Sequence, residues 1–280
     1  MRTIRCVNGF SIPCLGMGTW RFGGMVEHDP DNDDAGQIAA LQAGIDAGLT
    51  LIDTAEYYAA GYAETLVGRA IAGCDRGRFF LTSKVWKNHL RRDDVRRAAE
   101  STLRRLGTDY LDLYLYHQPS DEVPLEETIG AMNELVAEGL VRAIGISNFA
   151  ADRLRRAYRA TSVPFAVNQY HYNLAVREVE PEILGLCRAA GTVLQAWRPI
   201  RDLRESPLTV ELCRRHSVTL AQLALGWLLA QADISVITAM LNPRHIPETL
   251  AALELHLTPE ECRALRDDYP FRAKSGVPLR

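Results

Sequence analysis

Four side chains that can carry or move a proton occur at a regular spacing in the first half of the chain. Asp53, Lys84 and His117 are separated by 31 and 33 residues, and Tyr58 closely follows the first of them. Lys84 is one of only three lysines, and it ends the apolar run "RFFLTSK". A buried lysine keeps its charge beside a carboxylate, because the ion pair offsets desolvation.

Such an ammonium predicts acid chemistry at a neighbouring phenol. A cation favours the phenolate form, so we expect the pKa of Tyr58 to lie below its ordinary value of about 10. Tyr58 would then donate a proton to a carbonyl oxygen, and His117 would orient that oxygen with a second hydrogen bond. Lysine suits this task better than arginine, because its pKa is tunable and its charge is compact.

Each of these residues also has an ordinary structural explanation. Lys84 is consistent with a solvated strand end, and Asp53 with the N-cap of a helix. His117 is consistent with a core or rim histidine, and Tyr58 with packing. Chemistry is favoured by the combination, since all four lie at or just after the ends of consecutive apolar runs.

The spacing requires a fold in which consecutive strand ends meet. Most of the intervening segments have apolar residues at i, i+3, i+4 and i+7, as helices do. The alternation predicts an α/β fold, a single (β/α)8 TIM barrel over residues 1–280 with its active site at the C-terminal strand ends. The eight apolar runs end at Trp20, Asp53, Lys84, His117, Asn148, Gln169, Trp197 and Ala239.

Other signals refine this barrel. Asn8-Gly9 predicts an N-terminal β-hairpin. Residues 205–216 and 220–230 predict two helices, and "LTPEECRALRDD" predicts an extra C-terminal helix capped by Thr258 and Glu261. A doubly wound sheet is the rival architecture, but no G-x-G-x-x-G turn follows an early strand.

Composition excludes several functional classes. The net charge of −3 and the pI near 6.2 give no reason to expect a nucleic acid or an anionic membrane as partner. The six cysteines are scattered without metal-ligand spacing, which predicts reduced thiols in a cytoplasmic protein and no metal site. No apolar run is long enough to predict a membrane span.

The chain resembles the aldo-keto reductase family along most of its length. The similar segments are "LGMGTW", "LIDTAEYY", "LTSKVW", "LDLYLYHQP", "VRAIGISNF", "VNQYHYN" and "LNPRHIPETLAAL". The resemblance is to the bacterial branch that reduces small aldehydes and ketones, including methylglyoxal-type substrates. It implies that Tyr58 is the general acid, tuned by Lys84 and Asp53, and that His117 orients the carbonyl.

The same resemblance implies a nicotinamide cofactor and a set of residues that hold it. Ser147, Asn148 and Gln169 would bind the carboxamide, and Trp197 would stack on the nicotinamide ring. The substrate would lie against three aromatic side chains, namely Trp20, Tyr57 and Trp86.

Two segments depart from the family pattern. "WRPI" stands where an aromatic residue is usually followed by Ser-Pro-Leu, and Arg198 could meet the cofactor's pyrophosphate. Ala239 and Met240 replace the lysine and hydroxyl residue that usually hold the 2′-phosphate of NADPH. Arg244 or His245 could compensate, so we expect NADPH as cofactor with NADH tolerated.

The leading hypothesis is therefore an NAD(P)H-dependent carbonyl reductase, acting on a small-molecule carbonyl substrate as a monomer or weak homo-oligomer. Two alternatives stay open. One is a cofactor-binding sensor or regulatory subunit with little turnover. The other is a pathway enzyme that uses the same acid–base set for isomerisation or dehydration.

Overall fold

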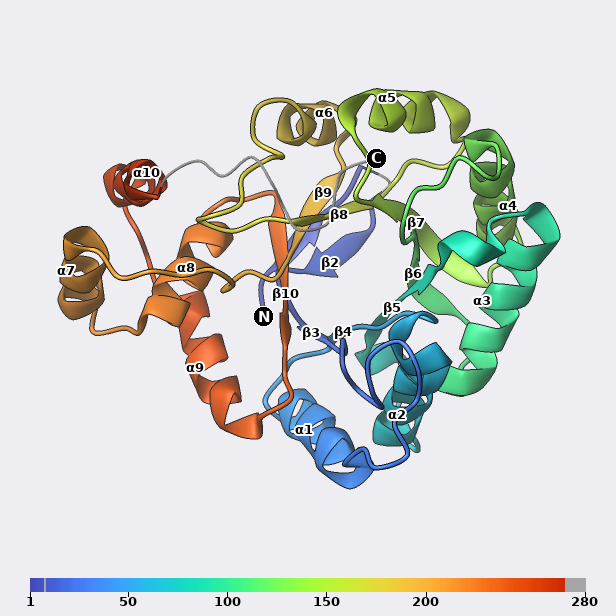
Figure 1. Cartoon of the computed structure of the whole chain (residues 1–280), viewed down its shortest axis with the longest axis horizontal. Coiled ribbons are helices and arrows are strands. Elements are labelled where there is room, and N and C mark those ends of the chain that lie inside the picture. Colours follow the sequence, from blue (N-terminus) through green and yellow to red (C-terminus); the bar gives the residue numbers. More distant parts are fainter. Residues whose placement is uncertain (8, 270–280) are drawn as a thin grey trace.

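Eight parallel strands close into a barrel at the centre of the molecule, as Figure 1 shows in a computed structural model that describes residues 1–7 and 9–269. Each strand pairs with the next one along the chain, and the last closes the ring on the first. This confirms the predicted (β/α)8 TIM barrel. The barrel strands are β3 (Leu15–Gly18), β4 (Leu51–Asp53), β5 (Phe80–Val85), β6 (Leu111–Tyr116), β7 (Val141–Ser147), β8 (Val167–His171), β9 (Val193–Trp197) and β10 (Ile234–Ala239).

Helices surround the ring of strands (Figure 1). They alternate with the strands, and α7 and α8 both lie between β9 and β10, as predicted. The helices are α1 (Asp34–Asp46), α2 (Tyr62–Ile71), α3 (Arg92–Leu106), α4 (Leu125–Ala137), α5 (Ala151–Ala160), α6 (Ile183–Ala190), α7 (Pro207–His216), α8 (Leu220–Leu229), α9 (Ile246–Ala251) and α10 (Pro259–Asp268). Short 3-10 turns are η1 (Tyr58–Gly61), η2 (Arg76–Arg78), η3 (Lys87–His89), η4 (Pro243–His245) and η5 (Ala252–Glu254).

The helix boundaries follow the capping residues. The capping box of α10 is formed by Thr258 and Glu261, as predicted. Helix α7 begins two residues later than predicted, because Ser206 caps it and Pro207 takes the first helical position. Pro247 lies in the first turn of α9, where a missing backbone donor costs little.

A two-stranded antiparallel sheet covers the N-terminal end of the barrel. It pairs β1 (Thr3–Arg5) with β2 (Ser11–Pro13), which confirms the predicted hairpin, although Asn8 itself lies outside the described residues. The ring of Phe10 lies 5.4 Å from that of Phe80, the first residue of β5. The opposite end of the barrel is therefore the one that a ligand can reach.

The barrel strands are buried, so polar side chains in them need hydrogen-bond partners in the interior. Residues 80–85 of β5 are all buried, including Thr82, Ser83 and Lys84. Neighbouring side chains on a strand point to opposite faces, so Ser83 and Lys84 lie on different sides of β5. Strand β3 ends at Gly18, so Trp20 lies beyond the strand rather than at its tip.

The cysteines form no disulfide bonds, and the helices no membrane span, in the part of the chain that the structure describes. All six cysteines are unpaired. Burial raises the pKa of the Cys6 and Cys187 thiols to about 11, which keeps them protonated and unreactive. Among the helices within residues 1–7 and 9–269, none has both the length and the apolar character needed to cross a membrane.

Candidate active site

A cavity of about 520 Å³ opens at the C-terminal ends of the barrel strands. It brings together residues from all eight strands or the loops that follow them, which are far apart in the sequence. The predicted site residues that line it are Trp20, Asp53, Tyr57, Tyr58, Trp86, His117, Ser147, Asn148, Gln169, Trp197 and Arg198. Lys84 lies behind this lining and is fully buried.

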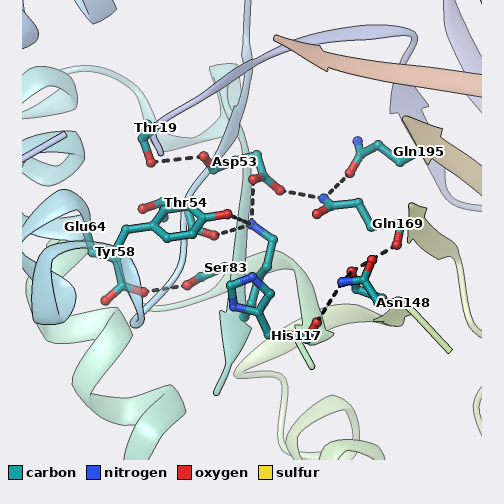
Figure 2. Close-up of polar contacts among 12 residues, drawn as sticks. Thr19, Asp53, Thr54, Tyr58, Glu64, Ser83, His117, Asn148, Gln169 and Gln195 are labelled. Atoms are coloured by element: carbon teal, nitrogen blue, oxygen red, sulfur yellow. Dashed lines mark hydrogen bonds and ion pairs between the residues drawn. The ribbon is translucent and has the colours of Figure 1, made fainter. Parts of the chain in front are cut away.

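The ammonium of Lys84 has three acceptors, one for each of its N–H groups. Its Nζ atom lies 2.5 Å from Oδ1 of Asp53 and 2.8 Å from the backbone oxygen of Thr54. The third acceptor is the hydroxyl oxygen of Tyr58, at 3.2 Å (Figure 2). Because an ammonium can only donate, the Tyr58 oxygen accepts this bond, and its own hydrogen must point elsewhere.

Asp53 is held as a carboxylate by donors on both of its oxygens. Lys84 donates to one oxygen, and Nε2 of Gln169 donates to the other at 2.8 Å. The same Gln169 nitrogen lies 2.7 Å from Oε1 of Gln195 (Figure 2). Burial alone raises the pKa of Asp53, and the contact with Lys84 opposes that effect.

The predicted downward shift of the Tyr58 pKa is wrong. Burial raises the pKa of Tyr58 above its ordinary value, and the nearby ammonium of Lys84 offsets only part of that rise. The pKa of Lys84 is also raised, because Asp53 and Tyr58 together outweigh the effect of burial. At neutral pH the site therefore holds a protonated phenol beside a protonated amine.

His117 follows β6 and faces the same cavity. Burial and the charge of Lys84 lower the pKa of His117 well below its usual range, so the imidazole is neutral. Its Nδ1 atom is buried and has no hydrogen-bond partner within the described part of the chain. The ring lies edge-on to Trp86 at 5.0 Å and to Tyr58 at 5.7 Å.

Three aromatic rings form one wall of the cavity. Tyr57 stacks between the other two, with its ring centre 3.8 Å from that of Trp86 and 6.2 Å from that of Trp20. Trp20 also lies edge-on to Tyr58 at 5.0 Å. The structure thus joins the three predicted substrate-side residues to the tyrosine, and their flat faces suit a small apolar carbonyl compound.

The residues predicted to bind the cofactor line the facing side. Nδ2 of Asn148 lies 2.9 Å from the Ser147 hydroxyl, and Asn148 has a left-handed backbone with φ 63°. The ring of Trp197 stacks on that of His171 at 4.6 Å. An indole, a hydroxyl and two amide side chains match the chemistry of a flat ring that bears a carboxamide, so these residues fit a nicotinamide.

The remaining predicted cofactor residues lie farther out. Arg198 lines the cavity, and its guanidinium carbon lies 5.0 Å from the centre of the Trp197 ring. Arg244 and His245 are exposed in η4, outside the cavity lining. Ala239 lines the cavity, as its place at the end of β10 predicts.

Sequence reasoning missed two polar residues that support the site. Gln195 is fully buried in β9 and donates through Nε2 to Ser235 of β10, in addition to its contact with Gln169. The sequence does indicate Gln195, because a glutamine inside the apolar run "VLQAW" needs hydrogen-bond partners in the interior. Thr54 contributes only its backbone oxygen to Lys84, and no side-chain pattern could have indicated that.

Comparisons with known proteins agree with this geometry. Residues 14–205 and 200–268 match the model of the aldo/keto reductase family. Methylglyoxal reductase YeaE of Escherichia coli is 35% identical over 272 residues, covering 93% of this chain and 92% of that protein. The NADH-specific methylglyoxal reductase of Escherichia coli is 30% identical, covering 90% of this chain and 93% of that protein.

Solved structures are similar over nearly the whole chain. A thermostable aldo-keto reductase, Tm1743, in complex with the inhibitor epalrestat has a TM-score of 0.91 and 40% identity, covering 95% of this chain and 99% of that one. An aldo/keto reductase from Klebsiella pneumoniae in complex with NADP and acetate has a TM-score of 0.87 and 37% identity, covering 99% of this chain and 98% of that one.

Proposed function

This chain belongs to the aldo/keto reductase family, and we propose that it uses Tyr58 as the general acid in reducing an aldehyde or ketone to an alcohol. The family and its NADP-bound relatives support an NAD(P)H-dependent carbonyl reductase. The observation that carries the role of Tyr58 is its contact with Lys84. Since Lys84 donates to the phenol oxygen, the phenolic hydrogen is left for a group in the cavity.

Each residue of the group then has a defined part. A reduced nicotinamide, when bound, supplies the hydride to the carbonyl carbon. Tyr58 donates its proton to the carbonyl oxygen, and Lys84 stabilises the phenolate that remains. Asp53 fixes the position and charge of Lys84. His117, as a neutral imidazole, donates a hydrogen bond that orients the carbonyl oxygen.

The raised pKa of Tyr58 is compatible with this role. A phenol that keeps its proton throughout the physiological range is always ready to donate it. Proton transfer from Tyr58 is favoured, because the phenolate charge that it creates forms 3.2 Å from the buried ammonium of Lys84.

The substrate class follows from the aromatic wall and the relatives. Trp20, Tyr57 and Trp86 offer flat apolar faces and few polar groups, which suits small aldehydes, 2-oxoaldehydes and aryl carbonyl compounds. The two relatives from Escherichia coli are named methylglyoxal reductases. We extend that activity to this chain as the first substrate to test.

The cofactor would lie along the facing side of the cavity. Ser147, Asn148 and Gln169 would bind the carboxamide, and Trp197 would stack on the nicotinamide ring. Arg198 would meet the pyrophosphate.

The outer end of the cofactor would lie near η4, where Arg244 and His245 are exposed. One relative is described as NADH-specific and others were solved with NADP or NADPH. We therefore propose that either form is accepted by this chain.

Steady-state oxidation of NADPH and NADH with a panel of small aldehydes and ketones tests the proposal. We expect turnover with at least methylglyoxal or an aryl aldehyde. Cofactor-dependent quenching of tryptophan fluorescence without turnover of any carbonyl would instead favour the sensor. Turnover of a substrate without net oxidation of the cofactor would favour an isomerase or dehydratase.

A further inference from the structure

A second polar contact lies on the opposite side of β5 from the ammonium of Lys84. The hydroxyl of Ser83 donates to Oε1 of Glu64 at 2.5 Å, and both side chains are fully buried (Figure 2). Glu64 belongs to α2, which follows directly after the turn that carries Tyr58. Ser83 immediately precedes Lys84. The contact therefore joins the two segments that supply the phenol and the ammonium.

Arg105 of α3 completes this contact from a third element. Its Nε atom lies 2.6 Å from Oε2 of Glu64, so each carboxylate oxygen has a donor. The guanidinium also packs against the backbone of Gly61, where an added Cβ would fall 2.7 Å from Nε. The turn after Tyr58 is thus held by the same arginine that holds Glu64.

The turn itself is strained. Ala59, Ala60 and Gly61 have successive positive φ values of 51°, 52° and 89°. A left-handed backbone is unfavourable for alanine, and such conformations persist only where the surroundings fix them. Here the amides of Ala59 and Ala60 bond to the backbone oxygens of Met25 and Val26, at 2.8 Å and 2.6 Å.

We propose that Glu64 and Ser83 are positioning residues, which hold the strained turn against β5 and so set the distance between the Tyr58 hydroxyl and the Lys84 ammonium. The inference rests on the proposed role of Tyr58 as acid. Neither residue lines the cavity, so Ser83 acts through Lys84, which follows it, and Glu64 acts through the turn that precedes α2. Without their bond, the turn can relax toward an unstrained backbone, and the tyrosine moves with it.

The contact could instead serve stability alone, because a buried carboxylate paired with an arginine is a common structural feature. Two measurements separate these roles. Displacing a reacting group by about 1 Å can lower kcat by up to about 10²-fold without affecting ligand binding. Moving Tyr58 away from Lys84 also removes the influence that lowers its pKa, so the alkaline limb of the kcat profile shifts to higher pH.

The test compares Ser83→Ala and Glu64→Gln with Asp112→Asn as a matched control. Asp112 is a buried carboxylate of β6 that pairs with Arg76 and accepts the backbone N–H of Leu81 of β5, near the N-terminal end of that strand. Its replacement removes a buried contact of the same strand, β5, far from the site. Ser83→Ala removes only a hydroxyl, so it remains informative if Glu64→Gln does not fold.

We expect Ser83→Ala to lower kcat about tenfold, with cofactor Kd within twofold of wild type and the alkaline limb moved upward. Asp112→Asn should lose stability while keeping the wild-type kcat and pH profile. The inference is overturned if Ser83→Ala is less stable but keeps both. That outcome leaves the proposed function standing, because the role of Tyr58 as the acid is tested separately by Tyr58→Phe.

Discussion

The Nζ atom of Lys84 lies 3.2 Å from the hydroxyl oxygen of Tyr58, although 26 residues separate them in the chain. The barrel brings them together because Lys84 lies in β5 and Tyr58 follows β4, the strand that pairs with β5. Since the lysine is also bonded to Asp53 and Thr54, its direction is fixed before any ligand binds. All three N–H groups of Lys84 therefore have fixed acceptors, and one of these acceptors is the Tyr58 hydroxyl.

Replacing Tyr58 with phenylalanine should abolish most carbonyl reduction. The variant loses the proton donor but keeps the ring that packs against Trp20 and His117. We expect kcat to fall at least 10²-fold, the usual contribution of a general acid, with cofactor Kd within about twofold. Single-turnover kinetics and titration of the intrinsic tryptophan fluorescence with cofactor measure the two quantities. A near-normal kcat would remove Tyr58 from the mechanism.

Asp53 and Lys84 should be strongly coupled in stability. Removing either one leaves a buried charge without its partner, which typically costs about 3–5 kcal/mol of unfolding free energy. The double variant Asp53→Asn with Lys84→Met removes both charges, so its loss should be about 2 kcal/mol smaller than the sum of the single losses.

Urea unfolding measures this cycle. The exposed pair of Arg156 and Glu126 serves as the control, and its coupling should stay below about 1 kcal/mol despite its two short contacts. Additive losses for Asp53 and Lys84 would mean that the ion pair does not hold the site.

The pH dependence of reduction should lack a histidine titration. His117 stays neutral because burial and Lys84 lower its pKa well below 6.5, and Tyr58 stays protonated because burial raises its pKa above 10. We expect kcat to be flat from about pH 6 to about pH 9 and to fall only as the phenol ionises. An inflection near pH 6.5 that disappears in His117→Gln would contradict the neutral imidazole.

His171 should make the protein less stable in acid. Burial, with a smaller contribution from Arg198, lowers the pKa of His171 to about 4. Between pH 6.5 and 4 the unfolded state therefore binds a proton that the folded state does not. This stabilisation is complete above pH 6.5 and is lost as the pH falls, by about 3 kcal/mol in all.

Chemical unfolding across this range compares wild type with His171→Phe, which can keep the stack on Trp197. The variant should show a flatter dependence of unfolding free energy on pH. His256→Gln changes an exposed histidine and should behave as wild type. An unchanged slope in His171→Phe would mean that other groups titrate in this window.

The preference for NADPH over NADH should be modest. Ala239 lines the cavity but offers neither charge nor hydrogen bond, and the side chain of Met240 is buried. We expect the ratio of kcat/KM values to stay below about a thousandfold, some 4 kcal/mol. Ala239→Lys should raise the ratio about tenfold through a charge-assisted contact, and Ala239→Gln should not. A wild-type ratio above a thousandfold would contradict this.

The sequence predicted the parts of the site that depend on strand order. Asp53 and Lys84 could be placed together because parallel strands present their C-terminal ends at one face. The aromatic wall was predictable only through the family resemblance, since nothing in the spacing of Trp20, Tyr57 and Trp86 requires them to stack.

Features that depend on the balance of opposing effects could not be predicted. The direction of the Tyr58 pKa shift was wrong, because the sequence reveals the nearby ammonium but not how far burial outweighs it. The contact between Glu64 and Ser83 was also missed. In the sequence, Glu64 has the features of an ordinary helix residue, and Ser83 those of a small residue in a strand. Only the folded chain brings Glu64 of α2 and Ser83 of β5 into contact.

The bond from Gln169 to Asp53 spans 116 residues and links β8 to β4, which stand on opposite sides of the ring. The shortest run of barrel strands that contains both partners extends from β4 to β8. The cavity is lined by residues from all eight strands or the loops that follow them, so the site is complete only when the ring of strands is closed. An assay of carbonyl reduction would consequently report on assembly of the entire barrel, and not merely on the presence of the reacting groups.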